Sequence, residues 1–159
     1  MGATTDRFLL DVMLGKLATY LRMMGYDTAY ALDRGIEADA AIRKLAVSEN
    51  RRLITRDREL ATRTEHALLV ESRGIDGQLA ELDAAGVSLT LGDPCRCAAC
   101  NGRLDRLAAE GSTNDDVPDP ADQPVWRCRQ CGQPFWKGSH WDDVAARLKR
   151  IRDTSTESG

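Results

Sequence analysis

Four of the five cysteines in this 159-residue chain fall into two Cys-x-x-Cys pairs, which constrain its C-terminal part more than any other feature. The pairs are Cys97 with Cys100 in "CAAC" and Cys128 with Cys131 in "CRQC". Two residues between cysteines let both sulfurs of a pair bind one ion, and four sulfurs in tetrahedral arrangement suit Zn²⁺. We therefore predict a structural zinc site at these four cysteines, in a ribbon too small to fold around its own core.

Disulfides and a redox motif are the alternative interpretations of the cysteines. Disulfides need an oxidising compartment, whereas the segment "MGATTDRFLLDV" lacks the charged and apolar regions of a secretory signal. A redox pair needs a βαβ context, and both pairs lie outside the strand–helix pattern. Cys95 has no partner at the right spacing, so we expect a free thiol, although it can replace Cys97. No apolar run approaches the roughly 20 residues of a membrane helix. We expect a cytoplasmic protein that does not bind membranes.

Short apolar runs alternate with helical patterns through residues 7–91. The patterns predict strands over 7–13, 26–32, 51–55, 66–71 and 87–91, and helices over 14–24, 39–48, 58–63 and 76–86. Such alternation favours a parallel sheet with helices on both faces, which is a three-layer α/β architecture. In these sheets ligands bind beyond the carboxyl ends of the strands.

The sequence changes character after Asp93. We predict an α/β domain over 1–93, a ribbon domain with an acidic insert and a C-terminal helix over 94–153, and a disordered tail over 154–159. The insert, 105–122, has six acidic residues and one basic residue, and we assign it no function; a flexible loop is predicted over 110–124. Residues 123–153 have seven basic residues against three acidic ones, so this part can face a polyanion despite the net charge of −3.

Three aspartates hold comparable positions in the predicted α/β domain. Asp11 and Asp57 follow apolar strands, and Asp39 lies at a helix start. Clustered carboxylates repel one another unless a cation lies between them, and Mg²⁺ or Mn²⁺ takes such oxygen ligands. Ions of this kind activate water and stabilise the leaving oxygen of a phosphodiester. The alternative is that each aspartate caps a helix or complements its dipole.

Other charged residues near these aspartates have weaker patterns. Arg22 and Arg56 can hold phosphate oxygens, or can form ordinary surface ion pairs. Nearby acids can supplement the three aspartates, although a solvated surface role is the more frequent one for such residues: Asp33, Glu37, Glu59 and Asp76.

Aromatic residues gather around the second cysteine pair. They are Trp126, Phe135, Trp136 and Trp141. Their rings can stack on bases, with help from Arg127, Arg129 and Lys137, or can form the small core of the ribbon. His140 can contact phosphate or cap the last helix. Lys137 and His140, with Arg22 and Arg56, are therefore our candidate substrate-binding residues.

Four separated motifs together resemble one known family. "LLDVMLGKLATYLRMMGYDT", "LITRD", "CAAC…CRQC" and "FWKGSHW" are similar, over roughly residues 8–148 and in the same order, to the Mut-seven C-terminal RNase domain family. The resemblance implies a PIN-like nuclease fold, here a three-layer α/β/α parallel sheet, joined to a small C-terminal zinc ribbon. It also implies a metal-dependent ribonuclease in which Asp11, Asp39 and Asp57 match the acidic positions. The fourth acid of PIN-like nucleases has no clear match, and Asp76 is a weak candidate.

The function we expect is that of an endoribonuclease whose three aspartates hold Mg²⁺ or Mn²⁺ and whose zinc ribbon and basic helix grip RNA. No obligate protein partner is inferred. The main alternative is a non-catalytic adaptor that binds RNA or the ribosome through its zinc ribbon. A toxin restrained by an antitoxin ranks last, because small PIN toxins lack the added ribbon.

Overall fold

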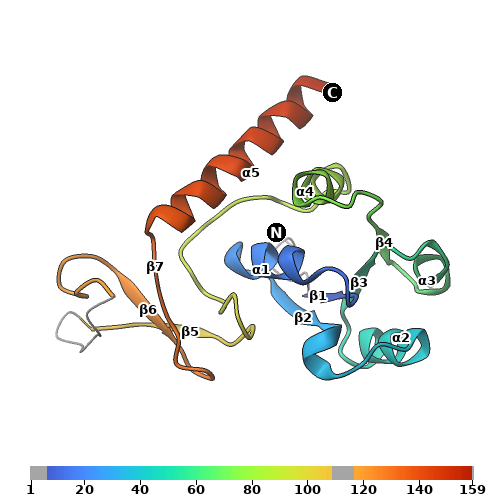
Figure 1. Cartoon of the computed structure of the whole chain (residues 1–159), viewed down its shortest axis with the longest axis horizontal. Coiled ribbons are helices and arrows are strands. Elements are labelled where there is room, and N and C mark those ends of the chain that lie inside the picture. Colours follow the sequence, from blue (N-terminus) through green and yellow to red (C-terminus); the bar gives the residue numbers. More distant parts are fainter. Residues whose placement is uncertain (1–6, 109–116, 159) are drawn as a thin grey trace.

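The computed structural model describes residues 7–108 and 117–158 of the chain (Figure 1). Its larger unit is a sheet of four parallel strands in the order β2-β1-β3-β4. The strands are β1 (Arg7–Leu10), β2 (Asp27–Tyr30), β3 (Arg52–Thr55) and β4 (Leu68–Leu69). The segments that connect or follow them are α1 (Gly15–Met23), the 3₁₀ helix η2 (Ala31–Arg34), α2 (Asp39–Ser48), α3 (Arg58–Arg63) and α4 (Ile75–Ala84).

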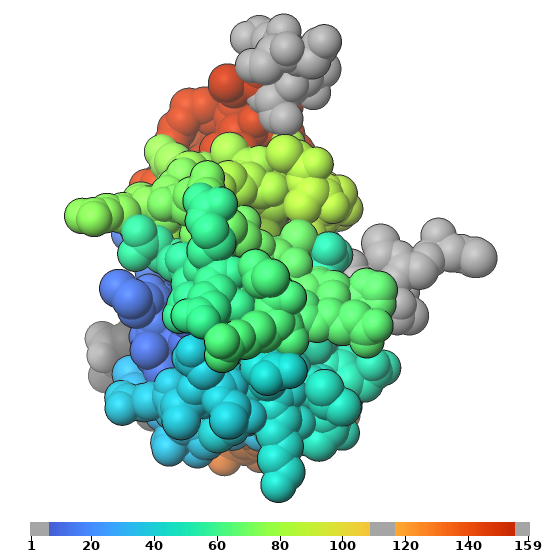
Figure 2. All heavy atoms as spheres, turned by 90° about the vertical axis from the view of Figure 1, so that its right-hand side faces the viewer, coloured from blue at the N-terminus to red at the C-terminus, as the bar shows by residue number. Residues whose placement is uncertain are grey.

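Side chains that alternate along the strands divide the core into two apolar layers. Phe8, Leu10 and Ile54 belong to the layer that α1 and α4 cover, whereas Leu9 and Leu53 belong to the layer under α2 and α3. Figure 2 shows the face of the molecule that lies on the right in Figure 1, where α2, α3 and α4 follow one another from the bottom upward. The predicted α/β class, with helices on both faces of a parallel sheet, is confirmed.

The strand order creates a topological switch point beside β1. The chain passes from β1 to β2 on one side and then crosses to β3 on the other side. Connections that leave neighbouring strands in opposite directions open a crevice at the carboxyl ends, where α/β sheets bind ligands. Leu10 pairs with Ile54 at this end, so the residues that follow β1 and β3 meet there.

The cysteine-rich part forms a second, antiparallel sheet. Its strands are β5 (Leu104–Arg106), β6 (Val125–Cys128) and β7 (Pro134–Trp136), in that spatial order. Arg22 of α1 fixes this ribbon to the main sheet through hydrogen bonds to the carbonyl oxygens of Ala98 and Ala99. The side chain of Asn101 accepts from the backbone N–H of Thr28, as a neighbouring strand would. The ribbon is therefore docked at the β2 edge.

Helix α5 (Ser139–Ser158) returns from the ribbon to the main core. Its apolar residues Val144, Leu148 and Ile151 are buried in the same cluster as α1 and α4. Arg147 forms an ion pair with Asp76 of α4. An amphipathic helix needs a partner surface for its apolar side, and the larger unit supplies it.

The predicted fifth strand is wrong. Residues 87–91 form no strand, although Val87 and Leu89 are buried as a strand pattern requires. Side chains from distant elements bind the backbone of this segment: Tyr26 donates to the Ser88 carbonyl oxygen, and Arg152 donates to that of Leu89. These carbonyl oxygens thus accept from side chains instead of from the backbone N–H groups of a neighbouring strand.

The end of the chain also differs from expectation. Helix α5 continues to Ser158, whereas the sequence predicts a disordered tail from residue 154. Each residue added to an existing helix gains one backbone hydrogen bond, so a polar sequence can extend it. The predicted flexible loop lies in part outside the described residues, at 109–116. Among the helices that the structure describes, none is both long and apolar enough to cross a membrane.

Candidate functional site

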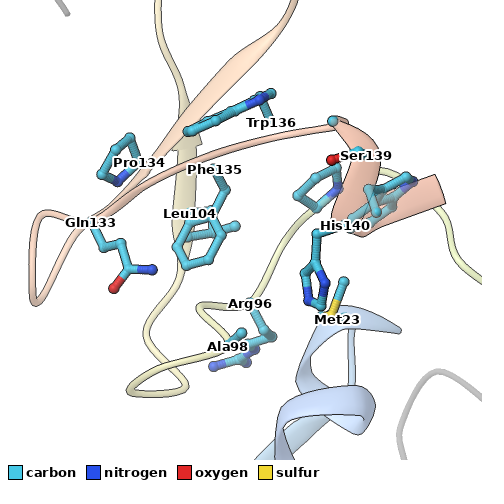
Figure 3. Close-up of a pocket in the computed structure, with 13 residues that line it drawn as sticks. Met23, Arg96, Ala98, Leu104, Gln133, Pro134, Phe135, Trp136, Ser139 and His140 are labelled. Carbon is cyan, nitrogen blue, oxygen red and sulfur yellow. The ribbon is translucent and has the colours of Figure 1, made fainter. Parts of the chain in front are cut away.

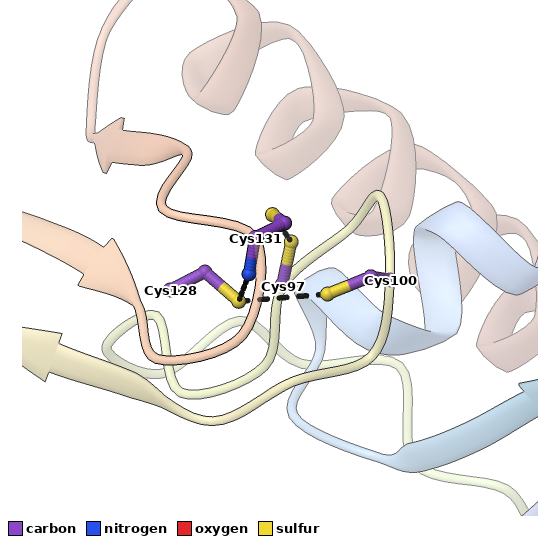
Figure 4. A group of neighbouring side chains, drawn as sticks. All are labelled: Cys97, Cys100, Cys128 and Cys131. Atoms are coloured by element: carbon purple, nitrogen blue, oxygen red, sulfur yellow. Dashed lines mark hydrogen bonds between the residues drawn. The ribbon is translucent and has the colours of Figure 1, made fainter.

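The four paired cysteines meet at one point of the ribbon (Figure 4). The Sγ atoms lie 3.7 Å apart for Cys97 and Cys131 and 3.5 Å apart for Cys100 and Cys128, and all four lie within 4.8 Å of one another. Zinc–sulfur bonds of about 2.3 Å in a tetrahedron separate the sulfurs by roughly 3.8 Å. The arrangement therefore fits a zinc ion held by four thiolates.

Backbone groups of the second cysteine pair help to fix this site. The N–H groups of Gln130 and Cys131 donate to Cys128 Sγ at 3.3 and 3.4 Å. Burial raises the pKa of Cys128, but the N–H donors of Cys131 and Gln130 outweigh burial and lower it to about 7. At Gly102 an added Cβ would lie 2.8 Å from Cys128 Sγ, so this position requires glycine.

Cys97 loses its proton when its sulfur coordinates a metal ion. Burial raises the pKa of its thiol to about 12. A metal that coordinates a thiol displaces its proton, and the binding free energy then contributes to folding. Cys95 is exposed and donates only a long hydrogen bond, 3.8 Å, to the Gly25 carbonyl oxygen. It does not belong to the group of four sulfurs.

The second group of candidate residues consists of three aspartates of the larger unit. We call Asp11 and Asp57, which follow β1 and β3, together with Asp39 at the start of α2, the acidic edge. Asp11 directly follows β1, and its backbone N–H donates to the Ile54 carbonyl oxygen of β3 at 3.1 Å. Its half-buried carboxylate accepts a 2.7 Å hydrogen bond from the Thr55 hydroxyl and another from the N–H of Val12. Asp11 is thus fixed by the neighbouring strand.

Helix capping explains one of the three aspartates but not the other two. Asp57 is the N-cap of α3, where its Oδ1 accepts from the N–H groups of Glu59 and Leu60. Asp11 caps no helix, because α1 begins after Leu14 without a side-chain cap bond. Asp39 is a first-turn acid of α2, whose N-cap is Ala38. The alternative therefore holds for Asp57 as a cap and for Asp39 as a first-turn acid that complements the dipole of α2, and it fails for Asp11.

The three aspartates do not come together as tightly as the cysteines do. Among the described residues, the four cysteines form the single group of three or more potential metal ligands within 4.8 Å of one another. Asp39 and Asp57 are exposed, at the starts of α2 and α3. Burial raises the pKa of Tyr30, and the charges of Asp33 and Asp11 raise it further, so both acids act on the Tyr30 hydroxyl.

The candidate phosphate-binding arginines have different environments. Arg22 is 4% exposed, and it donates to the carbonyl oxygens of Thr28, Ala98 and Ala99. Arg22 therefore joins the two units and is not a phosphate-binding residue of the proposed site. Arg56 lies between Thr55 and Asp57, and its buried Nε has no hydrogen-bond partner among the described residues.

The remaining candidates lie elsewhere in the fold. Lys137 pairs with Asp93 at 2.8 Å and lies over the Trp141 ring, and His140 is exposed at the start of α5. Asp76, the weak candidate for a fourth acid, instead pairs with Arg147 and Arg150.

The basic residues of α5 likewise have partners within the chain. Lys149 pairs with Asp153, and Arg152 donates to the Leu89 carbonyl oxygen. The Lys149–Asp153 pair lies within α5, whereas the Arg152 bond and the two ion pairs to Asp76 hold α5 against α4 and the segment after it.

Two residues that position these sites were not identified from the sequence. Thr55 appeared only as the end of a strand, because its bond to Asp11 depends on the register of β1 against β3. Asp27 binds Arg7, Arg51, Arg96 and Asn101, and so links the main sheet to the ribbon. A lone acid at the start of an apolar strand was the available signal for Asp27.

Residues 6–148 match the model of a protein family described as the Mut7-C RNAse domain. The match spans both units, from the strand before Asp11 to the middle of α5. Neither the curated proteins nor the solved structures gave a match to this chain.

Proposed function

The chain belongs to the Mut7-C RNAse domain family, and we propose that it is a metal-dependent endoribonuclease that acts at the acidic edge. The family description supports a nuclease function with RNA as substrate. The positions of two aspartates support the acidic edge as the place of cleavage. Asp11 and Asp57 follow the two strands on either side of the switch point, where open α/β sheets bind ligands.

The observation that carries the proposal is the attachment of Asp11. A half-buried carboxylate that caps no helix is held 2.7 Å from the hydroxyl of a fully buried threonine on the next strand. Burial disfavours the charged form of a carboxylate unless hydrogen bonds or a cation compensate. A side chain fixed in this way is suited to binding an ion rather than to stabilising a helix.

In the proposal, Asp11, Asp57 and Asp39 hold Mg²⁺ or Mn²⁺. The ligand atoms fit in type, because Asp57 uses one carboxylate oxygen as a cap and keeps the other, and Mg²⁺ takes oxygen ligands and retains waters. The bound ion supplies a water of lowered pKa and neutralises charge on the phosphate. Arg56, with its unpartnered Nε, contributes positive charge beside Asp57.

The ribbon has a separate role in the proposal. Zinc at the four cysteines folds it, and its docking at the β2 edge holds its outer surface in a fixed relation to the acidic edge. Thiolate ligands require reduced cysteines, which agrees with the cytoplasmic location expected from the sequence. RNA is the partner, bound in part through the ribbon.

The test is cleavage of assorted RNAs by the purified chain with divalent metal, with chelator, and with Asp57→Asn. Cleavage is expected to require added Mg²⁺ or Mn²⁺ and to be lost in Asp57→Asn, while Asp143→Asn on α5 stays active as the matched control. The chelator must leave the zinc in place, which zinc analysis verifies. Equal cleavage by wild type and Asp57→Asn from matched preparations contradicts the proposal.

A non-catalytic adaptor remains the second candidate. The observation that favours it is that only the cysteines, among the described residues, gather as closely as metal ligands do. An adaptor binds RNA without cleaving it, and its binding survives replacement of all three aspartates by asparagine. Metal-dependent cleavage that is lost in Asp57→Asn excludes this candidate.

A further inference from the structure

A pocket of about 350 Å³ lies between the ribbon, the end of α1 and the start of α5 (Figure 3). Its volume is at the small end of the range of about 300–1,000 Å³ for ligand pockets. Its walls are mainly apolar, and residues from three parts of the chain form them, including Met23, Leu104 and Trp136. None of the residues of the acidic edge or the zinc site lines this pocket.

Aromatic rings are concentrated here. Phe135, Trp136 and Trp141 all line the pocket, and all three are only partly buried. By contrast Phe8 and Trp126 are buried in the two units. An aromatic residue that forms a small core is normally shielded from water, so three partly open rings around one space indicate a surface for a flat ligand.

Gly138 allows the Trp136 indole to lie where it does. A Cβ at this position would lie 2.8 Å from Nε1 and 3.2 Å from Cδ1 of Trp136. The indole therefore lies directly over the backbone of the segment that leads into α5. Any larger residue at Gly138 must displace the ring that forms one wall of the pocket.

Polar groups surround the apolar walls. Figure 3 shows the Trp136 indole on one side of the pocket, Arg96 and Ala98 on the opposite side, and Gln133 and His140 at its flanks. The Arg96 guanidinium is held by the Asn101 carbonyl oxygen at 3.1 Å and by Asp27 at 3.6 Å. An amide, an imidazole and a fixed guanidinium are the groups that hydrogen-bond or stack on nucleobases.

Helix α1 connects the pocket to the loop that begins at Asp11. Met23, the last residue of α1, lines the pocket, whereas Gly15, the first, follows the loop that begins at Asp11. Nine helical residues span about 13 Å at about 1.5 Å per residue. The two ends of α1 are therefore about 13 Å apart, a span that a short single strand can cover.

We propose that this pocket binds one unpaired base of an RNA strand, stacked on Trp136 with its edge directed to Gln133 and His140. The proposal rests on the proposed function for RNA as the ligand. A paired base cannot enter, because its faces and edge are occupied in the duplex, so the pocket selects single-stranded RNA and fixes the register of the strand relative to the acidic edge.

The test follows the indole Nε1–H resonances of the three tryptophans by NMR in the full-length, zinc-loaded Asp11→Asn protein. The probes are the four nucleoside monophosphates and ribose 5-phosphate, which lacks a base. At least one nucleotide is expected to shift Trp136 and Trp141 saturably and to leave Trp126 unmoved, and ribose 5-phosphate to shift none. No shift with any nucleotide, or the same shift with ribose 5-phosphate, overturns the proposal.

Variants and RNA strands extend the test. Gly138→Ala and Trp136→Leu are expected to weaken binding of a labelled single-stranded RNA about tenfold. Gly92→Ala, where an added Cβ meets nothing within 4 Å, is expected to bind like the parent. The same RNA in a duplex is expected to bind more weakly than the single strand. Equal affinities of Trp136→Leu and the parent contradict the pocket.

The Asp11→Asn background separates this proposal from the nuclease. Saturable nucleotide binding without any cleavage by the wild type supports the pocket and contradicts the endoribonuclease. Metal-dependent cleavage by the wild type without nucleotide binding at Trp136 and Trp141 supports the endoribonuclease and contradicts the pocket.

Discussion

The Thr55 hydroxyl donates a 2.7 Å hydrogen bond to the Asp11 carboxylate and so joins the ends of β1 and β3. The same oxygen accepts from the backbone N–H of Asp57 at 3.0 Å. One fully buried side chain therefore positions two of the three aspartates of the acidic edge.

Replacing Thr55 tests this connection. Thr55→Val keeps the shape of the side chain but removes both bonds, and a hydrogen bond to a charged group contributes about 1.5–3 kcal/mol. We expect the free energy of unfolding to fall by about that amount and kcat for RNA cleavage to fall without a matching change in KM. Thr55→Ser retains the hydroxyl and should recover most of the activity. A Val variant with wild-type kcat would contradict the positioning role.

Zinc binding distinguishes the cysteines. Cys100→Ser removes one of the four sulfurs, so we expect loss of bound zinc and unfolding of the ribbon at a lower temperature. Cys95→Ser should keep one zinc per chain, because its sulfur lies outside the group. Elemental analysis and thermal unfolding measure both effects. Zinc lost in Cys95→Ser and kept in Cys97→Ser would show that Cys95 is the ligand.

Arg22 separates a structural role from substrate binding. Arg22→Met leaves the carbonyl oxygens of Thr28, Ala98 and Ala99 without this donor, and a buried unsatisfied group such as that of Thr28 costs about 1–3 kcal/mol. We expect a lower free energy of unfolding in urea and faster proteolysis of the ribbon. A phosphate-binding arginine would raise KM at unchanged stability, and that result would restore the prediction made from the sequence.

Acid should weaken the contact between the main sheet and the ribbon. Burial opposes the charge of Asp27, but hydrogen bonds from Asn101 and Arg51 and the charges of Arg51 and Arg96 outweigh it, so the pKa of Asp27 is lowered. The unfolded value is about 3.9. The contribution of Asp27 to stability is therefore complete above that pH and is lost as the pH falls below it.

Urea unfolding at several pH values measures this contribution. We expect Asp27→Asn to be less stable than wild type near pH 6, and the difference to shrink from about pH 4 downward. Hydrogen bonds from Arg34 and Arg51 lower the pKa of Glu49 to about 2. Protonation of Glu49 should therefore also destabilise the wild type over a similar pH range. A difference that stays constant with pH would show that the charge of Asp27 is not what matters.

Local patterns were enough for much of the fold. Helices α2 and α3 begin and end where the sequence placed them, at 39–48 and 58–63. Helix α3 follows its N-cap Asp57, and α2 starts with the first-turn acid Asp39 and buries Ile42 and Ala46 on one side. The segment 87–91 failed, because a buried apolar run looks the same whether a strand or distant side chains bind its backbone.

The zinc site and the acidic edge differed in how much of each could be predicted from the sequence. Cys97, Cys100, Cys128 and Cys131 were found from spacing alone, since the ligand geometry of each pair is local. The acidic edge depends on which strands are neighbours, so Thr55 carried no signal and Arg22 carried a misleading one. The aromatic pocket needed three segments brought together by the docking of the ribbon.

The single-turnover rate constant for RNA cleavage by Asp11→Asn, measured against wild type with saturating Mg²⁺ or Mn²⁺, tests the central claim most directly. Asparagine can still accept the hydrogen bond from Thr55, so folding and zinc content should match wild type, while the rate constant is expected to fall by about 100-fold or more because a charged ligand is lost. A rate constant equal to that of wild type would contradict catalysis at the acidic edge.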